Sequence, residues 1–428
     1  MPESTRPKIL ILLNTYLPGY KAGGPIRSIA NLVESFGDEF EFRILTSDRD
    51  HRSKSPYRDV PAHEWVRVGK AQVMYVPPRC ASIPSMIRII RQTDPEVLYI
   101  NSLFSTLYSI VPMLLRWLRL IRPRMVMLAP RGELSKGALQ FKRWKKYPFR
   151  KTARMVRLHE SVLWHASTQH EARDILGEFF GSDVAVAAPL PVLTACDLPD
   201  RPPTASAQAP RREKPAGSLR IVFLSRISRM KNLDGALSML DGLRGDVLFS
   251  IYGPAEDSVY WRQCCEIMRR LPANVRVEYR GEVSHDRVAE CLAESDLFFL
   301  PTHGENYGHV IAEALAAGCP VLISDQTAWR GLEEKGVGWD LPLDAPERFR
   351  TALQRCVDMQ PDEFQALSER AWRFAVQHGS DSEIFRSNLE LLNFAVRYPF
   401  IAGPDGQPEP YATTSGEAMP ETGKGAPR

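Results

Sequence analysis

The chain has 428 residues, of which 44% are hydrophobic and 25% are charged, and its formal net charge is +4. This length allows two or three domains, and the apolar content is sufficient for two hydrophobic cores. The seven cysteines form no Cys-x-x-Cys spacing, which excludes the usual metal and redox motifs and indicates reduced thiols in a cytoplasmic protein. The polar start of the chain and the lack of any run of about 18 apolar residues exclude a signal sequence and a transmembrane helix.

The first half of the chain alternates short apolar segments with helical patterns. Because these segments are apolar throughout, they indicate parallel strands that are buried on both faces. Strands are predicted at 8–13, 40–46, 72–76, 97–101, 125–129 and 184–188. The pattern is typical of a Rossmann-like α/β domain.

A glycine pair follows the first predicted strand. Gly23 and Gly24 precede Pro25 and the helical pattern from Ile26 to Phe36. Adjacent glycines let the backbone approach a ligand closely, and proline suits the first helical position. The segment does not match the G-x-G-x-x-G dinucleotide fingerprint, and a plain strand-to-helix turn is the alternative.

The second predicted strand ends at Asp48-Arg49-Asp50, which has the form of a metal-binding D-x-D motif. Its place at the carboxyl end of a strand is where such a motif would lie.

A basic segment with interleaved aromatic residues spans residues 136–157. It holds nine cations and no acidic residue between Glu133 and Glu160, together with Trp144, Tyr147 and Phe149. This mixture favours contact with an anionic membrane surface. A solvated basic helix is the alternative, and nucleic acid is not expected because no recognised nucleic-acid motif accompanies the segment.

Two further residues of this half are candidates for contact with an acceptor. Arg131 follows the strand predicted at 125–129 and faces the same edge of the sheet, and His165 ends the next apolar stretch. A lone histidine in such a place is more often structural than catalytic.

Residues 197–218 are rich in proline, alanine and charge, and predict a linker after a first domain at 1–196. A second alternating set follows, with strands near 220–225, 247–252, 275–280, 296–300 and 320–324, and forms a second Rossmann-like domain at 219–381. Residues 382–402 have a helical pattern, and residues 403–428 predict a disordered tail.

Two cations follow the first strand of the second domain. Arg226 lies at the carboxyl end of this strand, and Lys231 lies just before a helical pattern. A helix start is an unfavourable place for a cation, so an anionic partner is expected. Arginine offers phosphate a planar fork and lysine a movable point charge, so the pair suits a diphosphate.

The segment from Pro301 to Asp325 reads PTHGENYGHVIAEALAAGCPVLISD and predicts a strand end, a loop, a helix and another strand. Glu305 lies in the loop and Glu313 on the helix, eight residues later. On one continuous helix the carboxylates would be ~12 Å apart. That exceeds the roughly 5–9.5 Å of a glycosidase pair. Two separate roles on an elongated ligand such as a nucleotide-sugar fit better.

These motifs resemble a family-4 (group 1) retaining glycosyltransferase with the two-domain GT-B fold, of the bacterial polysaccharide-assembly type. The resemblance is carried by Glu305-(x)7-Glu313 with its flanks, by LSRISRMKNLDGAL from Leu224 to Leu237, and by KILILLNTYLPGYKAGGPIRSIANL near the start. It spans about residues 8–400.

The resemblance implies a role for each motif residue in binding a nucleotide-sugar. Arg226 and Lys231 would clamp the diphosphate, Glu305 would hold the sugar hydroxyls, and Glu313 the ribose hydroxyls. The remaining implied contacts are the phosphates with Gly23, Gly24 and the backbone of Asn306, Tyr307, Gly308 and His309, and the base with the strand end at Val283. Helix 382–402 would cross back to the first domain. Neither a metal nor another cofactor is implied, because the two cations can neutralise the leaving phosphate.

The expected activity is transfer of a sugar, with retained anomeric configuration, to a hydroxyl of a lipid-linked oligosaccharide or polysaccharide in cell-surface or exopolysaccharide biosynthesis. The expected location is the cytoplasmic face of the plasma membrane. Two alternatives stay open, a sugar-nucleotide epimerase with the same fold and a non-catalytic scaffold of a polysaccharide-assembly complex.

Overall fold

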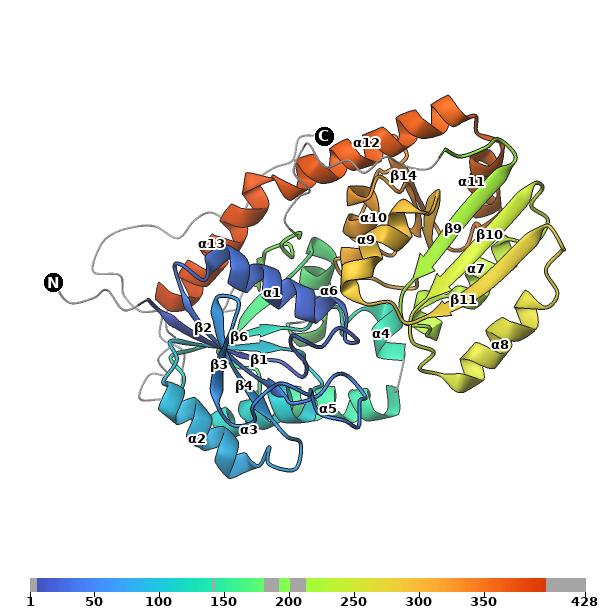
Figure 1. Ribbon diagram of the computed structural model, residues 1–428. Helices are drawn as coiled ribbons and strands as arrows, with labels where there is room; N and C mark the ends of the chain where they lie inside the picture. Colours follow the sequence, from blue (N-terminus) through green and yellow to red (C-terminus); the bar gives the residue numbers. More distant parts are fainter. Residues whose placement is uncertain (1–5, 141–142, 181–191, 201–212, 398–428) are drawn as a thin grey trace.

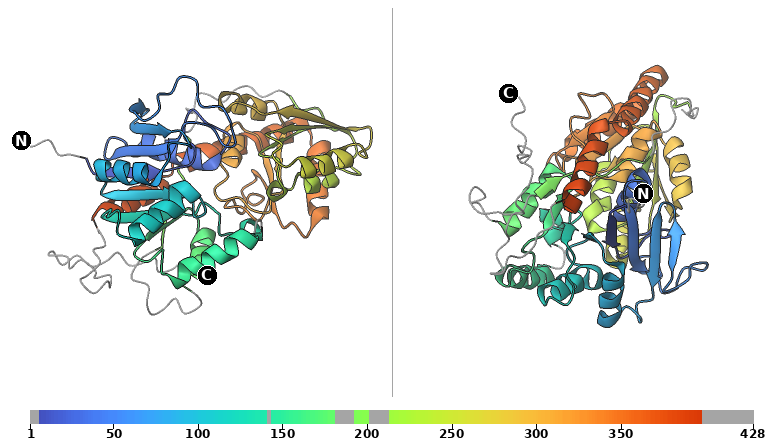
Figure 2. Two further views of the ribbon diagram at one scale, coloured as in Figure 1. Left: turned by 90° about the horizontal axis from the view of Figure 1, so that it is seen from below. Right: turned by 90° about the vertical axis from the view of Figure 1, so that its left-hand side faces the viewer.

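The computed structural model describes residues 6–140, 143–180, 192–200 and 213–397. Within these residues the chain forms two α/β domains side by side, each built around one twisted sheet (Figures 1 and 2). This architecture confirms the predicted pair of Rossmann-like domains. The strand predicted at 184–188 and the tail at 403–428 lie outside the described residues.

The first sheet has the strand order β3-β4-β2-β1-β5-β6-β7-β8 in the described part of the chain. Its pairings are parallel except for that of β3 with β4 at one edge. The strands are β1 Lys8–Leu12, β2 Glu41–Ser47, β3 Trp65–Val68, β4 Ala71–Val76, β5 Val97–Asn101, β6 Met125–Ala129, β7 Leu163–Ala166 and β8 Val192–Thr194. The helices are α1 Gly24–Phe36, α2 Ile83–Thr93, α3 Val111–Trp117 after the π-helical turn η1 Thr106–Ile110, α4 Lys136–Gln140, α5 Arg143–Met155 and α6 Gln169–Phe179.

The second sheet has the order β11-β10-β9-β12-β13-β14, and its pairings are all parallel. Its strands are β9 Ser218–Leu224, β10 Asp246–Tyr252, β11 Val275–Gly281, β12 Leu297–Leu300, β13 Val321–Ser324 and β14 Gly338–Leu341. The helices are α7 Leu233–Met239 after the 3-10 turn η2 Arg229–Lys231, α8 Ser258–Met268, α9 His285–Ala293, α10 His309–Ala316, α11 Pro346–Asp358, α12 Pro361–Gly379 and α13 Ser382–Arg397.

The last two helices connect the domains (Figure 1). Helix α12 packs on α10 of the second domain, whereas α13 packs on β6 and β8 of the first. Leu391 and Leu392 of α13 belong to the same buried cluster as Ile9 and Ile11 of β1. The chain therefore returns to its first domain, where the resemblance places helix 382–402.

Candidate active site

Two neighbouring parallel strands bring the predicted diphosphate-binding residues, Arg226 and Lys231, close to Glu305. Strands β9 and β12 are neighbours, with Ile221 paired to Leu297. Loops at the carboxyl ends of neighbouring parallel strands meet at one edge of the sheet. Arg226 and Lys231 follow β9, and the loop that holds Glu305 follows β12. The backbone carbonyl of Met230 joins the two loops, because it accepts a hydrogen bond from His303 N at 2.8 Å.

Lys231 and Glu305 form an ion pair at this edge, with 2.5 Å between Nζ and Oε2. Only 10% of the Lys231 side chain and 20% of the Glu305 side chain are exposed. Burial alone would raise the pKa of Glu305, but the charges of Lys231 and Arg226 and a hydrogen bond from Lys231 hold that pKa below its usual range. Glu305 is therefore ionised at neutral pH, and a buried cation and a carboxylate meet where the sequence predicts the sugar and the diphosphate.

Arg226 lies beside this pair and is more open to solvent. Its side chain is 43% exposed, and its Nη1 lies 3.9 Å from Oε2 of Glu256, which follows β10. Its charge also lowers the pKa of Glu305. Arg226 is thus an accessible cation next to a buried one, which is an arrangement suited to a diphosphate.

The N-terminus of α10 is the third positive element of the site. Gly308 caps this helix in a left-handed conformation with φ 78°, and no side chain caps the helix. A Cβ at Gly308 would lie 2.8 Å from Cδ1 of Ile311 and 3.0 Å from Cγ of Glu305, so this turn requires glycine. The uncapped backbone N–H groups of a helix start are an anion-binding site. The side chain of Tyr307 is buried beside Trp329 and His378, so the predicted contact of this segment with phosphate can involve only its backbone.

The first domain contributes the predicted glycine pair opposite α10. Gly23 caps α1 with φ 69°, and a Cβ at Gly24 would lie 3.8 Å from Cδ2 of His309. Ser28 Oγ of α1 lies 3.1 Å from Nε2 of His309. The helix starts of α1 and α10 therefore meet at the domain boundary, where Gly24 lies against His309, and the phosphate contacts of these residues stay a prediction.

Asn306 and Gly132 also meet across this boundary, because a Cβ at Gly132 would lie 3.2 Å from Cβ of Asn306. The predicted acceptor residues are less accessible. Arg131 donates to Tyr99 Oη at 2.8 Å and forms an ion pair with Asp197. His165 is 2% exposed, and its Nδ1 lies 2.6 Å from the same Tyr99 hydroxyl.

Both side chains therefore belong to a buried polar network of the first domain. Burial and the charge of Arg131 lower the pKa of His165 to about 4, so its ring is neutral. The network is a structural reason for these residue types, and a role for Arg131 or His165 toward an acceptor stays a prediction.

Glu313 occupies the second turn of α10, with 18% of its side chain exposed and its Oε1 3.9 Å from Nδ1 of His285. Burial and the nearby Asp200 raise its pKa to about 7, against the opposing charge of Arg27. Val283 is partly buried against the core of the second domain, in the loop before α9. Glu313 therefore lies one turn beyond the N-terminus of α10, and the ribose and base contacts stay predictions.

The aspartates of the D-x-D motif have contacts within the protein. Asp48 pairs with Arg49 at 2.8 Å, and Asp50 accepts hydrogen bonds from the backbone N–H groups of Tyr20 and Lys21 at 3.0 and 3.2 Å. These bonds hold the loop that carries the glycine pair. Among the described residues there is no group of three or more side chains that could hold a metal ion.

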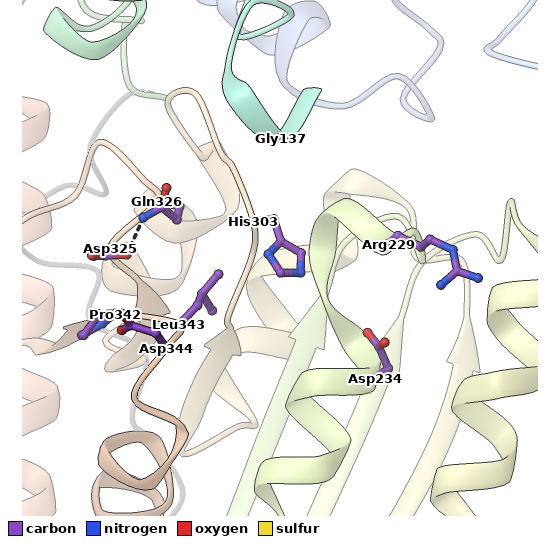
Figure 3. Close-up of a pocket in the computed structure, with 9 residues that line it drawn as sticks. All are labelled: Gly137, Arg229, Asp234, His303, Asp325, Gln326, Pro342, Leu343 and Asp344. Atoms are coloured by element: carbon purple, nitrogen blue, oxygen red, sulfur yellow. Dashed lines mark hydrogen bonds between the residues drawn. The ribbon is translucent and has the colours of Figure 1, made fainter. Parts of the chain in front are cut away.

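A cavity of about 580 Å³ lies beside His303 in the loop after β12 (Figure 3). It is lined by Gly137 of α4 and by residues at the carboxyl ends of β9, β12, β13 and β14, namely Arg229, Asp234, His303, Asp325, Gln326, Pro342, Leu343 and Asp344. Neither the sequence motifs nor the resemblance indicates this cavity.

Sequence reasoning also missed Glu256, which lies near His51 and the two arginines Arg52 and Arg226. No local pattern marks it, since His51 and Arg52 come from the other domain.

Comparisons with known proteins find a related family and related folds. The model of the family "Glycosyl transferases group 1" matches residues 206–371. The D-inositol 3-phosphate glycosyltransferase of Xylanimonas cellulosilytica is 29% identical over 163 residues, which are 37% of this chain and 39% of the relative. The phosphatidyl-myo-inositol mannosyltransferase of Mycobacterium tuberculosis is 37% identical over 86 residues, 20% of this chain and 22% of the relative. The chain therefore matches well under half the length of these curated relatives.

Solved structures show the same two-domain fold across most of the chain. Sucrose-phosphate synthase of Thermosynechococcus elongatus has a TM-score of 0.61 and 16% identity, over 91% of this chain and 98% of the other. HepE of Anabaena, in complex with UDP and glucose, has a TM-score of 0.62 and 14% identity, over 91% and 99%. WaaG, a glycosyltransferase involved in lipopolysaccharide biosynthesis, has a TM-score of 0.62 and 14% identity, over 90% and 99%. The second domain of this chain therefore matches the group 1 glycosyltransferase family, and the two domains together have the GT-B fold.

Proposed function

We propose that this protein transfers a sugar from a nucleotide-sugar donor to a hydroxyl group of a glycan acceptor. One observation carries the proposal. The buried Lys231–Glu305 pair lies at the carboxyl ends of β9 and β12, together with Arg226 and the N-terminus of α10. Two cations and a helix start can stabilise a departing diphosphate, and an ionised carboxylate can hold the sugar beside it. A sugar-nucleotide has both parts in line.

The chemistry follows from charge development. As the bond between C1 of the sugar and the diphosphate oxygen lengthens, positive charge grows on the sugar ring and negative charge on the phosphate. The negative charge of Glu305 would stabilise the sugar ring, and the positive charges of Lys231 and Arg226 beside it would stabilise the phosphate. Preorganised charges of this kind are the largest single contribution in many enzymes. Since the protein supplies the cations, we propose that no metal or other cofactor is required.

We further propose that the anomeric configuration is retained by front-face attack. Glu305 is held by Lys231 at 2.5 Å, which supports an orienting role rather than that of a nucleophile. An oxygen of the departing phosphate would then accept the proton of the acceptor hydroxyl as this hydroxyl attacks C1 from the same face.

For the acceptor, we propose a lipid-linked oligosaccharide or a growing polysaccharide in the assembly of cell-surface or exported glycans. Two relatives support this class by their names, because one acts on phosphatidyl-myo-inositol and WaaG serves lipopolysaccharide biosynthesis. Within the described residues, no helix is both long enough and apolar enough to cross a membrane.

A face of α5 supports contact of the protein with the membrane surface. Trp144, Tyr147 and Met155 are 74%, 55% and 74% exposed. They alternate with the exposed Lys151 and Arg154 at helical spacing, so apolar and basic side chains share one face. We propose that this α5 face (residues 144, 147, 151, 154 and 155) binds anionic lipid on the inner side of the plasma membrane.

The structure also refines which cations of 136–157 can serve that face. Lys146 donates to the carbonyl of Ala138 at 2.7 Å and lies 4.7 Å from the ring centroid of Phe104. Arg150 forms an ion pair with Glu178. These two cations point into the first domain, so a test of membrane contact should change Lys151 and Arg154 instead.

The decisive experiment for the activity is a screen of several nucleotide-sugars for thermal stabilisation, followed by turnover with the best donor. The variant Lys231→Met should lower turnover by at least about 100-fold, as expected for one lost transition-state contact. The exposed Arg262→Gln on α8 is a matched loss of charge and should leave turnover unchanged. Turnover of Lys231→Met at the parent rate would refute the clamp.

Two further readouts separate the remaining alternatives. NMR of the product reports the anomeric configuration, and inversion would contradict front-face attack. Donor incubated without acceptor should stay intact, since an isomerised sugar would identify an epimerase. For the membrane, flotation with vesicles containing phosphatidylglycerol should decrease for Lys151→Glu/Arg154→Glu, and unchanged flotation would reject the α5 face.

A further inference from the structure

Two arginines from opposite domains share one carboxylate oxygen beside the proposed diphosphate site. Arg52, in the loop after β2 of the first domain, has its Nη1 3.3 Å from Oε2 of Glu256. Arg226 of the second domain has its Nη1 3.9 Å from the same oxygen. Because both guanidinium groups reach one atom, a single small anion could contact both.

The direct ion-pair contacts of Glu256 bring two arginines to one carboxylate. Glu256 is also 3.9 Å from Nε2 of His51. Burial and the charges of Arg226 and Arg52 lower the pKa of His51, so its ring is neutral at neutral pH. One carboxylate therefore faces two permanent cations. The Asp50 carboxylate is held in place beside them, because its oxygens accept backbone hydrogen bonds from Tyr20, Lys21 and His51.

The position of the cluster links it to the site already described. Arg226 forms an ion pair with Glu256, and its charge also lowers the pKa of Glu305. The Arg52 side chain is 56% exposed and Glu256 13% exposed, so the arginine can move while the carboxylate stays in place. A phosphate that carries two negative charges attracts both arginines more strongly than a carboxylate with one.

We propose that Arg52 is a further ligand of the donor, joining Arg226 on the terminal phosphate of the nucleoside diphosphate, and that Glu256 holds both arginines until this phosphate binds. The inference rests on the proposed function and adds to it a binding residue from the first domain. Because each domain would supply one arginine to the same phosphate group, binding of the donor would favour closure of the two domains.

The test measures the affinity of the full-length protein for whichever of ADP, GDP, UDP and dTDP binds best, and for the matching monophosphate, by titration calorimetry. Arg52→Gln should weaken the diphosphate by roughly five- to tenfold, less than for a fully buried charged contact because the side chain is partly exposed. The monophosphate should change by less than twofold. Lys54→Gln removes an exposed cation two residues away and serves as the control.

The variant Glu256→Gln provides an independent test, because it should change the affinity for the diphosphate in the opposite direction. Removal of the competing carboxylate should tighten binding of the diphosphate by a fewfold and leave the monophosphate unchanged. If Glu256 merely bridges the domains, the variant should instead weaken both nucleotides. The thermal unfolding of each variant shows whether it is folded before the titration.

Three results would overturn the inference. The first is binding of the diphosphate to Arg52→Gln within twofold of the parent. The second is an equal loss of affinity for both nucleotides in Arg52→Gln. The third is weaker binding of the diphosphate to Glu256→Gln. Each of these leaves the proposed function intact provided that the parent protein binds a nucleoside diphosphate. If the parent binds none of the four, the proposed function fails and this inference fails with it.

Discussion

Glu313 offers the sharpest test of the donor site, because its ionisation is linked to stability. Burial and the neighbouring Asp200 raise its pKa from 4.5 to about 7. Between these two values the folded protein keeps a proton that the unfolded chain has released. The free energy of unfolding therefore falls as pH rises through this window and levels off above the folded pKa.

The size of the effect follows from the shift. The full difference corresponds to about 3 kcal/mol, of which about 1 kcal/mol falls between roughly pH 6 and 8. In Glu313→Gln this pH-dependent loss is absent, since the amide carries no proton to release. Denaturant unfolding of both proteins across this range should show the variant gaining about 1 kcal/mol on the parent. A difference in unfolding free energy that stays constant with pH would refute the reasoning.

The same carboxyl group should make nucleotide binding depend on pH. If Glu313 accepts hydrogen bonds from the ribose hydroxyls, it must be ionised when the nucleotide is bound. Affinity should then fall by up to about tenfold for each pH unit below the folded pKa. The phosphate itself titrates near pH 6, so the comparison is with Glu313→Gln, in which only the phosphate contribution remains. Parallel pH profiles of parent and variant would contradict a role for Glu313 in binding ribose.

Other substitutions test the remaining parts of the site. Lys231→Met leaves the Glu305 carboxylate buried without its cation, so it should cost about 3–5 kcal/mol of stability at neutral pH. Most of this cost should return in Lys231→Met/Glu305→Gln, and it should shrink as pH falls, because the lowered pKa of Glu305 makes the pair stabilising only while the carboxylate is ionised. Gly308→Ala should cost more than Gly23→Ala in thermal unfolding. Both have positive φ, but only at Gly308 does a new Cβ meet atoms within 3.0 Å, whereas at Gly23 it meets nothing within 4 Å.

The buried parallel strands could be predicted because their sequence signal is strong. Val97–Asn101 and Met125–Ala129 are apolar throughout their centres, and the structure has both strands at the predicted residues. Two strands at sheet edges, β3 and β14, were missed, although the edge strand β11 lies where it was predicted. In β3, Trp65–Val68, the side chains are half-buried or exposed, and in β14, Gly338–Leu341, a glycine and an aspartate interrupt the apolar pattern. Edge strands bury less surface, so less of their sequence has to be apolar.

The clamp could be predicted because strand ends are a local property of the sequence. Arg226, Lys231 and Glu305 each follow an apolar strand, and parallel neighbours bring such ends together. The partner of each cation could not be predicted in the same way. Glu256 lies near Arg52 only because the domains face each other there, and no spacing along the chain encodes that contact.

The start of the predicted linker also has contacts that the sequence does not predict, and these contacts hold the N-terminus of α10. Composition predicts a linker from residue 197, yet Asp197 is buried and pairs with Arg131. It also accepts a hydrogen bond from Ser28 at 2.8 Å and lies 4.0 Å from Nε2 of His309. A buried carboxylate requires such partners, and here they come from both domains. Since His309 is the first residue of α10, Asp197 and Ser28 fix the helix start on which the phosphate is proposed to bind, and the first domain thereby positions a site that belongs mainly to the second.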